Sequence, residues 1–220
     1  ILGNVLDLGQ PSDDTVTAAK LNNDIISGQT ALTSEPADTD EFLVSDAGTL
    51  KRLDYSLIKA SGITNAQSWR ITSSFTSATS ETDISSNWEE SDSTGYARIG
   101  DIVTQSSGIF TFAATGIYLM IAQAAFRSND GTRSTQFNIK ATTNNSTYTH
   151  VISAEQSNSD VGGGSNTSYH AGALPVLFDV TDTAQVKFRF TVQSTANSQT
   201  CDGDTDRTYT GFTIIRLGDT

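Results

Sequence analysis

Short segments with the alternation of β-strands recur along this chain from Trp69 onward. They are separated by turn-forming stretches such as Asn129-Asp130-Gly131 and Gly162-Gly163-Gly164. No convincing helix interrupts them, and many short strands with regularly spaced turns are typical of an all-β domain. We therefore predict an all-β sandwich or jelly roll. The predicted strands are Trp69–Thr76, Ala97–Gln105, Gly108–Ala113, Gly116–Arg127, Arg133–Thr142, Tyr148–Glu155, Tyr169–Val180, Gln185–Gln193 and Tyr209–Leu217.

Alternation within the strands indicates which faces are buried. In Val186–Val192 every second residue is apolar and the residues between are polar or charged, as in a strand with one side in a core and one in solvent. The segment Ile117–Ala122 differs because both of its faces are apolar or aromatic. Such a strand needs cover on both sides, and we expect another subunit to provide the second cover. The alternative is a locally thick core covered by a loop.

Composition supports the all-β class and excludes others. Ser and Thr number 27 and 32, more than a quarter of the 220 residues, while charged residues make up only 17%. β-Branched Thr suits a pleated surface, and hydroxyl side chains satisfy turns. A net charge of −12 without a Lys/Arg cluster argues against a nucleic-acid partner. No apolar run approaches the ~18 residues of a membrane span.

The first 62 residues differ in composition from the rest. They contain ten acidic and four basic residues, and their only aromatic side chains are Phe42 and Tyr55. We predict a stalk or anchoring segment over 1–62 and a head domain over 63–220. Within the first segment, Asp13–Leu21 is predicted as a short capped helix. The chain begins without Met or a basic leader, which is what we expect of an internal piece of a longer protein.

Residues 41–53 read as two short strands around the turn Ser45-Asp46-Ala47-Gly48. A lone two-stranded hairpin is marginally stable in water. We therefore expect this hairpin to pack against copies of itself or against another protein.

Three stretches of the head resemble the C1q-like branch of the C1q/tumour-necrosis-factor jelly-roll superfamily. The first is Gly108–Met120, with Phe112 as its aromatic residue and a Gly-x-Tyr at 116–118. The second is Ala173–Val192, where a small-residue strand precedes a loop and an aromatic strand. The third is Thr208–Ile215, which is similar to that family's closing strand. The resemblance covers about residues 66–218, with Ala114 in place of the usual Pro and Tyr209 in place of the usual Phe.

This resemblance implies a homotrimer assembled around a threefold axis. In that family aromatic and aliphatic residues of the inner sheet form the subunit interface. Carried over to this chain, the expected trimer-interface residues are Phe112, Tyr118, Met120 and Tyr209.

Residues 10–60 resemble the linker and shaft-type segments of marine bacteriophage structural proteins. The stretch that carries this resemblance is TVTAAKLNNDIISGQTAL followed by ADTDEFLVSDAGTLKRLDYSLI. Such segments recur in tail fibres and other virion appendages. This resemblance implies that the N-terminal part lies next to the virion and that the head is exposed.

Asp202, Asp204 and Asp206 alternate just before the last predicted strand. Three such carboxylates can converge on Ca²⁺, which takes several oxygen ligands in irregular loops. Some C1q-like heads bind Ca²⁺ with acidic residues near the threefold axis, so the resemblance favours a calcium site here. The alternative is a solvated acidic turn whose charge is screened by Arg207.

No constellation of residues indicates an enzyme. The chain lacks a nucleophile elbow and a zinc-spaced His/Cys set. Glu89-Glu90 beside Trp88 could supply a carboxylate pair for glycoside cleavage, but this segment fits a solvated loop better. Trp88 and Trp69 could stack on a sugar, but both fit a core better. His150 and His170 are expected to be surface or hydrogen-bonded residues, with a metal or anion site on a threefold axis as the alternative.

We therefore predict a non-enzymatic bacteriophage virion protein, a trimeric fibre or spike. Residues 1–62 would contact other virion proteins. The head would bind a host receptor or surface glycan through loops at Ser128–Thr132, Ser157–Asn166 and Ser194–Asp206. One alternative is a purely structural capsid decoration or head fibre. The other is a glycan-degrading tail spike, although such proteins more usually contain a longer repetitive β-helix.

Overall fold

The computed structural model describes residues 24–58, 62–128, 132–158, 167–196 and 199–220. The chain divides into two compact units, Ile1–Ala60 and Ser61–Thr220, which we call the N-terminal unit and the head. The helix predicted over Asp13–Leu21 lies outside the described residues, as do the centres of the predicted binding loops at 129–131 and 159–166. Among the described residues, no helix has the length and apolarity that a membrane span requires.

The N-terminal unit contains the predicted hairpin. Strands β1 and β2 pair antiparallel, and the turn between them places Ala47 and Gly48 at φ +49° and +85°. Two consecutive positive φ angles are typical of the tight turns that match strand twist. Leu43 and Leu50 remain exposed, so the described part of this unit buries little apolar surface. Its elements are α1 (Asp24–Ser27), β1 (Glu41–Asp46), β2 (Thr49–Asp54) and the 3₁₀ turn η2 (Tyr55–Leu57).

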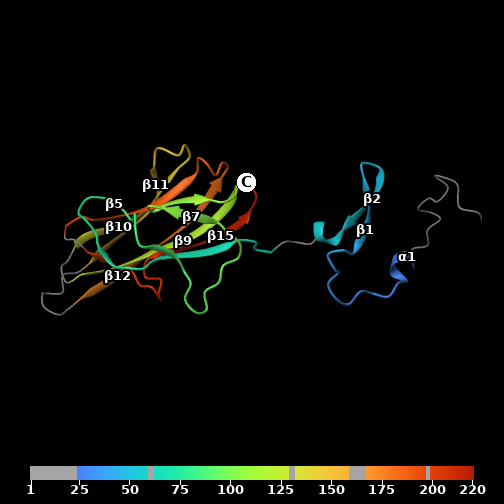
Figure 1. The fold of residues 1–220 in the computed structure, drawn as a ribbon, viewed down its shortest axis with the longest axis horizontal. Coiled ribbons are helices and arrows are strands. Elements are labelled where there is room, and N and C mark those ends of the chain that lie inside the picture. The colour runs from blue at the N-terminus through green and yellow to red at the C-terminus, as the bar shows by residue number, and fades with distance from the viewer. Residues whose placement is uncertain (1–23, 59–61, 129–131, 159–166, 197–198) are drawn as a thin grey trace, which may run out of the picture. The chain divides into compact units, whose positions relative to one another are not determined.

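The head is a sandwich of two antiparallel sheets (Figure 1). In the described residues one sheet has seven strands and the other has six. The seven-stranded sheet contains β3 (Ala66–Ile71), β4 (Phe75–Thr76), β6 (Trp88–Glu90), β9 (Gly116–Ser128), β12 (Ser168–Val180), β14 (Thr200–Cys201) and β15 (Gly211–Gly218). The six-stranded sheet contains β5 (Thr82–Asp83), β7 (Val103–Ser106), β8 (Ile109–Phe112), β10 (Thr132–Thr142), β11 (Thr149–Asn158) and β13 (Lys187–Ser194).

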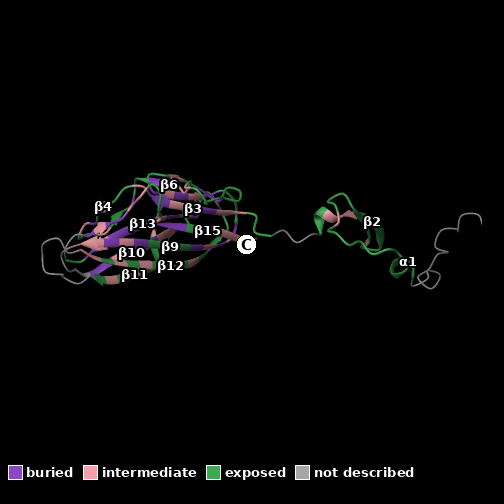
Figure 2. Cartoon of the chain, turned by 90° about the horizontal axis from the view of Figure 1, so that it is seen from below, coloured by how far each residue is buried: buried purple, intermediate pink, exposed green. Residues whose placement is uncertain are grey.

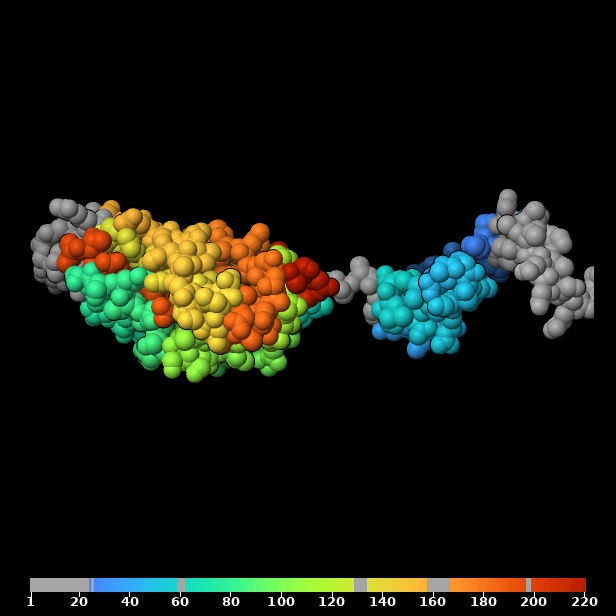
Figure 3. All heavy atoms as spheres, turned by 90° about the horizontal axis from the view of Figure 1, so that it is seen from above, coloured from blue at the N-terminus to red at the C-terminus, as the bar shows by residue number. Residues whose placement is uncertain are grey.

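Strand β9 organises the seven-stranded sheet. It pairs with β12 along one side, and with β15 and then β14 along the other. Strands β11 and β12 belong to different sheets but lie side by side and close one edge of the sandwich (Figure 3). Gly172 permits this approach, because a Cβ at that position would lie 3.0 Å from Cβ of Ala154. The predicted all-β jelly roll is therefore confirmed.

Several predicted strand boundaries are wrong. The segment 97–105 forms a strand only from Val103, and 69–76 is interrupted at residues 72–74 between β3 and β4. Glu89-Glu90 was predicted as a solvated loop, but both residues lie in β6, which pairs with β3. Strands β4 and β6 pair through only two and three residues, too few for alternation to be visible in the sequence.

Aromatic rings fill the centre of the head. Phe110 is fully buried, and its ring centroid lies between 4.9 and 5.9 Å from those of five other aromatic residues. These neighbours are Trp69, Trp88, Phe188, Phe190 and Phe212. Figure 2 shows buried residues concentrated in the head strands, whereas the N-terminal unit is largely exposed. The rings come from both sheets, so this cluster joins the two layers.

The two faces of β9 have different partners, and this corrects the predicted interface. Tyr118 and Met120 are 1% and 0% exposed and face the other sheet, with the Tyr118 ring 4.8 Å from that of Phe112. Phe112 is itself 2% exposed. Their assignment to a trimer interface is wrong, because side chains enclosed within one chain cannot contact another. Period-two alternation places Ile117, Leu119 and Ile121 on the outer face instead.

Replacing Phe110 with Ala is expected to lower the free energy of unfolding of the head by about 3–5 kcal/mol, because the change opens a cavity among five rings. Urea unfolding followed by tryptophan fluorescence measures this loss, since Trp69 and Trp88 both lie in the head. Phe42→Ala in the N-terminal unit serves as the control and should leave the transition in place. Equal transitions for the two variants would contradict a core centred on Phe110.

Candidate binding site

The loop from Asp202 to Thr208 lies between β14 and β15 and is held against two strands. The amide of Asp202 donates to the carbonyl of Ala125 on β9, and the amide of Asp204 donates to the carbonyl of Ile71 on β3, each at 2.9 Å. Gly203 passes close to the chain that follows β3, where a Cβ would lie 2.6 Å from the carbonyl carbon of Ser73. Only glycine fits there without moving the backbone.

Two of the three carboxylates predicted to bind calcium, those of Asp202 and Asp204, have separate partners. Oδ1 of Asp202 accepts from Nε of Arg127 at 2.6 Å. Oδ1 of Asp204 accepts from the amides of Asp206 and Arg207 at 2.7 and 3.0 Å, which closes a turn. Within one chain, the described residues contain no group of three acidic, His or Cys side chains that could hold a metal ion. The predicted convergence of these carboxylates is therefore not formed in one chain.

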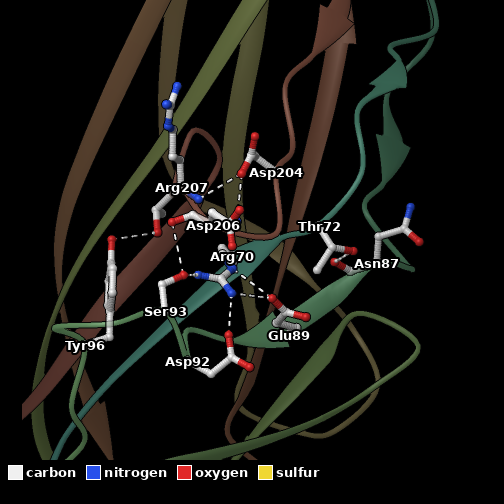
Figure 4. Close-up of polar contacts among 11 residues, drawn as sticks. Arg70, Thr72, Asn87, Glu89, Asp92, Ser93, Tyr96, Asp204, Asp206 and Arg207 are labelled. Carbon is white, nitrogen blue, oxygen red and sulfur yellow. Dashed lines mark hydrogen bonds and ion pairs between the residues drawn. The ribbon is translucent and has the colours of Figure 1, made fainter.

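A buried arginine anchors the other side of the loop (Figure 4). Arg70 on β3 is 0% exposed, and its Nε and Nη2 donate to Oε1 of Glu89 at 2.8 and 2.6 Å. Nη2 also reaches Oδ1 of Asp92 at 2.5 Å, and Nη1 donates to Oγ of Ser93 at 2.7 Å. The Ser93 hydroxyl in turn donates to the carbonyl of Asp206 at 3.1 Å. Arg70 thus links β3, β6 and residues 91–93 to the loop from Asp202 to Thr208, which we call the acidic loop.

Arg70→Ala is expected to destabilise the head by about 3 kcal/mol, the lower end of the range for breaking a buried ion pair. The loss stays at the lower end because Asp92 and Glu89 both retain access to water. The matched control is Arg98→Ala, which breaks exposed pairs with Glu90 and Asp101 and should cost less than about 1 kcal/mol. Chemical denaturation measures both values, and similar losses would contradict an anchoring role for Arg70.

A pocket of about 650 Å³ lies beside Asp202 and Asp204. Its wall includes Arg127 from β9, Tyr169 from β12 and Tyr209 from the segment before β15. Tyr169 is directly opposite Arg127 in the β9–β12 register, so strand pairing brings the ring and the guanidinium together. Tyr169 and Tyr209 are 70% and 38% exposed. Of the four predicted interface residues, Tyr209 alone reaches the surface, and it lies in this pocket.

His170 lies at the inner side of the pocket. Its ring stacks on that of Phe126, with centroids 5.3 Å apart and planes 17° apart. Neither ring nitrogen has a hydrogen-bond partner among the residues that the structure describes, and both are shielded from solvent. This burial lowers the pKa of His170 below its usual 6.5. The folded head therefore favours the neutral imidazole.

Acidification should destabilise the head through His170. Below pH 6.5 His170 binds a proton more readily in the unfolded chain than in the folded head, because its pKa is lowered by folding. Protonation therefore favours the unfolded state. The free energy of unfolding is unaffected by this residue above pH 6.5 and decreases as the pH falls from 6.5 toward the lowered pKa. Thermal melting from pH 7.5 to 5.0 should show a smaller loss of Tm for His170→Phe than for the unmodified chain. Parallel curves for His170→Phe and the unmodified chain would contradict this assignment.

The other candidate residues lie away from the pocket. His150 is on the surface, with Nε2 2.8 Å from Oε1 of Glu81, as expected for a hydrogen-bonded surface histidine. Trp88 is in the core and donates its Nε1 hydrogen to the carbonyl of Ile84 at 2.8 Å. Glu89 holds Arg70, and Glu90 pairs with Arg98. The structure therefore brings Asp202, Asp204, Tyr209 and His170 to one pocket but not the two tryptophans or the glutamates.

Three residues of the site were not among those predicted from the sequence: Arg70, Arg127 and Tyr169. The acidic run Glu89-Glu90-Ser91-Asp92 was a signal that a basic side chain lay nearby. Carboxylates that enter a sheet are partly removed from water and need a positive charge as a partner. Arg127 and Tyr169 gave no comparable signal. Their proximity arises from the register between β9 and β12, which are 40 residues apart, and alternation alone does not define that register.

Comparison with known proteins indicates a fold and no family. No family model matches the chain, and no curated protein matches it either. Among solved structures, murine APRIL at pH 5.0 is 13% identical, with a TM-score of 0.50 over 70% of this chain and 98% of that one. Murine APRIL at pH 8.5 is 14% identical, with the same TM-score and the same coverage of both chains. The head is therefore a jelly roll of the TNF/C1q-like kind.

Proposed function

We propose that this chain is a non-enzymatic virion protein of a bacteriophage, a homotrimer whose jelly-roll head attaches to the host surface. The observation that carries the trimer is an uncovered apolar surface on the outer side of the seven-stranded sheet. The virion assignment is supported by the resemblance of residues 10–60 to bacteriophage appendage segments. The binding role is supported by the pocket at one end of the same sheet.

The uncovered surface comprises Leu119, Ile121, Pro175, Leu177 and Ile215, which we call the apolar face. Strand register places Leu177 and Ile215 on either side of Leu119 and places Pro175 beside Ile121, so the five residues form two adjacent rows across β12, β9 and β15. Leu177 is 62% exposed and Ile121 is 50% exposed. A contiguous apolar patch of this kind on a sheet usually marks an interaction surface.

A second and a third copy of the chain are the partners that best fit this face. Burying one leucine or isoleucine side chain contributes about 1.5–3 kcal/mol, so several of them recurring at each contact can hold an assembly together. A head-to-tail contact that closes after three subunits buries the same face in every copy. The resemblance of the head to C1q-like domains favours three subunits over two.

The N-terminal unit suits attachment to a larger assembly. Leu43 and Leu50 are exposed on opposite strands of its hairpin, on the same side of the two-stranded sheet. Such a hairpin gains stability when a partner covers it. With the N-terminal unit bound to other virion proteins, the three heads would present their binding sites together, and weak sites would act with avidity.

A Leu177→Glu variant tests the assembly. Light scattering after size exclusion should give three times the 23.4 kDa chain mass for the unmodified protein and a single chain mass for the variant. The reason is that Leu177 is exposed in the single chain but would lie next to charge-free apolar surface in the trimer. Val151→Glu places the same change at an exposed aliphatic residue of the six-stranded sheet and should leave the mass unchanged. A monomeric unmodified chain would overturn the trimer.

Binding to host cells tests the attachment role separately. The purified trimer should bind host cells and reduce adsorption of the virion, and Leu177→Glu should do so less well because it loses avidity. Absence of cell binding, with unchanged adsorption of a virion lacking the chain, would instead indicate a purely structural decoration. Release of reducing ends from host polysaccharide would indicate a glycan-degrading spike.

A further inference from the structure

We propose that the pocket beside Arg127 and Tyr169 binds an uncharged saccharide. This inference rests on the proposed attachment function and names its ligand class. The site is formed by β9, β12 and the acidic loop of one chain, and its volume of about 650 Å³ lies in the range of ligand pockets.

Two tyrosines supply flat surfaces for a sugar ring. Tyr169 projects from β12 with 70% of its surface exposed, so most of its ring is not used for packing within the chain. Tyr209 lies in the same wall and is 38% exposed. A tyrosine ring offers an apolar face and a hydroxyl at its edge. The C–H groups on one face of a pyranose can stack on such a ring while its hydroxyls reach polar neighbours.

Arg127 is positioned to donate to those hydroxyls. Its Nε is held by Oδ1 of Asp202 at 2.6 Å, and Asp202 is almost fully buried. This contact fixes the plane of the guanidinium group. The terminal Nη1 and Nη2 groups have no partner within the described part of the chain, so they can bind a ligand that enters beside Tyr169. The hydroxyl of Ser74 adds a further polar group to the wall.

The charges of the pocket favour an uncharged ligand. Arg127 contributes one positive charge, whereas Asp202 and Asp204 contribute two negative charges, and His170 is neutral at neutral pH. An anion would be repelled by the second carboxylate and by the net charge of −12 on the chain. A cation would find both carboxylates already engaged, Asp202 by Arg127 and Asp204 by the amides of Asp206 and Arg207. A ligand rich in hydroxyls satisfies the donors and acceptors without either cost.

The pocket and the apolar face occupy different parts of one sheet surface. Both include odd-numbered residues of β9, but Ala125, the nearest pocket residue on that strand, is four residues from Ile121, or about 13 Å along the strand. A neighbouring subunit seated on the apolar face therefore does not need to enter the pocket. This separation favours a saccharide over a second copy as the occupant.

Saturation-transfer NMR on the full chain in its native assembly tests the proposal. The probes are the methyl glycosides of glucose, galactose, mannose and N-acetylglucosamine, with 3′-sialyllactose as the anionic probe. At least one uncharged glycoside should bind, and Tyr169→Ala should weaken its binding at least tenfold. Arg127→Lys should also weaken binding, because it keeps a charge for Asp202 but removes the guanidinium donors. Tyr148→Ala should leave binding unchanged, since Tyr148 faces Arg189 elsewhere in the head at 4.4 Å from ring centroid to guanidinium carbon.

The outcomes separate this proposal from the trimer. Saccharide binding that persists in monomeric Leu177→Glu would support a site contained in one chain. Binding of no uncharged glycoside, equal binding by Tyr169→Ala, or preference for 3′-sialyllactose would overturn the proposal and leave the trimer untouched. Loss of the trimer mass in Tyr169→Ala would show that the pocket belongs to the subunit interface, and would also overturn it.

Discussion

The two-sided burial required by β9 is the constraint on which the rest of the structure depends. One face of this strand is buried in the core, where Tyr118 packs against Phe112, and the other carries Leu119 and Ile121 toward the outside. Strands β12 and β15 flank β9 and extend that outer surface with Leu177 and Ile215. The outer apolar residues stay in contact with water unless a partner covers them, and such a patch usually marks an interaction surface. In the proposed trimer, one strand would therefore serve both the folding of the chain and its assembly.

The acidic loop shows how the fold supports a site at a distance from the core. Arg70 holds one side of the loop through Ser93 and the carbonyl of Asp206, while Arg127 holds the other side through Asp202. Each arginine pairs with a carboxylate for which the sequence suggested another role. Glu89, the partner of Arg70, was expected in a solvated loop, and Asp202, the partner of Arg127, was expected to bind calcium. The two ion pairs fix the backbone on which Tyr209 and Asp204 are placed, so the shape of the pocket depends on contacts outside it.

The sequence predicts the architecture better than the site. Alternation identified the jelly roll and the apolar character of both faces of β9, because period-two patterns directly report burial. It could not say which face points inward, and the resemblance led to Tyr118 and Met120, which the structure places in the core. The opposite face was equally apolar, so sequence alone offered no basis for choosing. Arg127 and Tyr169 meet only through strand register, a non-local property that composition and motif spacing do not encode.

The two proposed interactions of the outer sheet surface differ in their response to salt. Contacts through Leu177 and its neighbours depend on apolar burial, which ionic strength barely screens and which excluded salts strengthen. Stacking of an uncharged sugar on Tyr169 involves no net charge on the ligand, so screening has little effect on it either. The charge of −12 on each chain still repels neighbouring heads and the anionic polymers of a cell surface. An acidic head that recognises neutral groups would therefore hold its target most firmly at high ionic strength, where this repulsion is screened while its own attractive contacts persist.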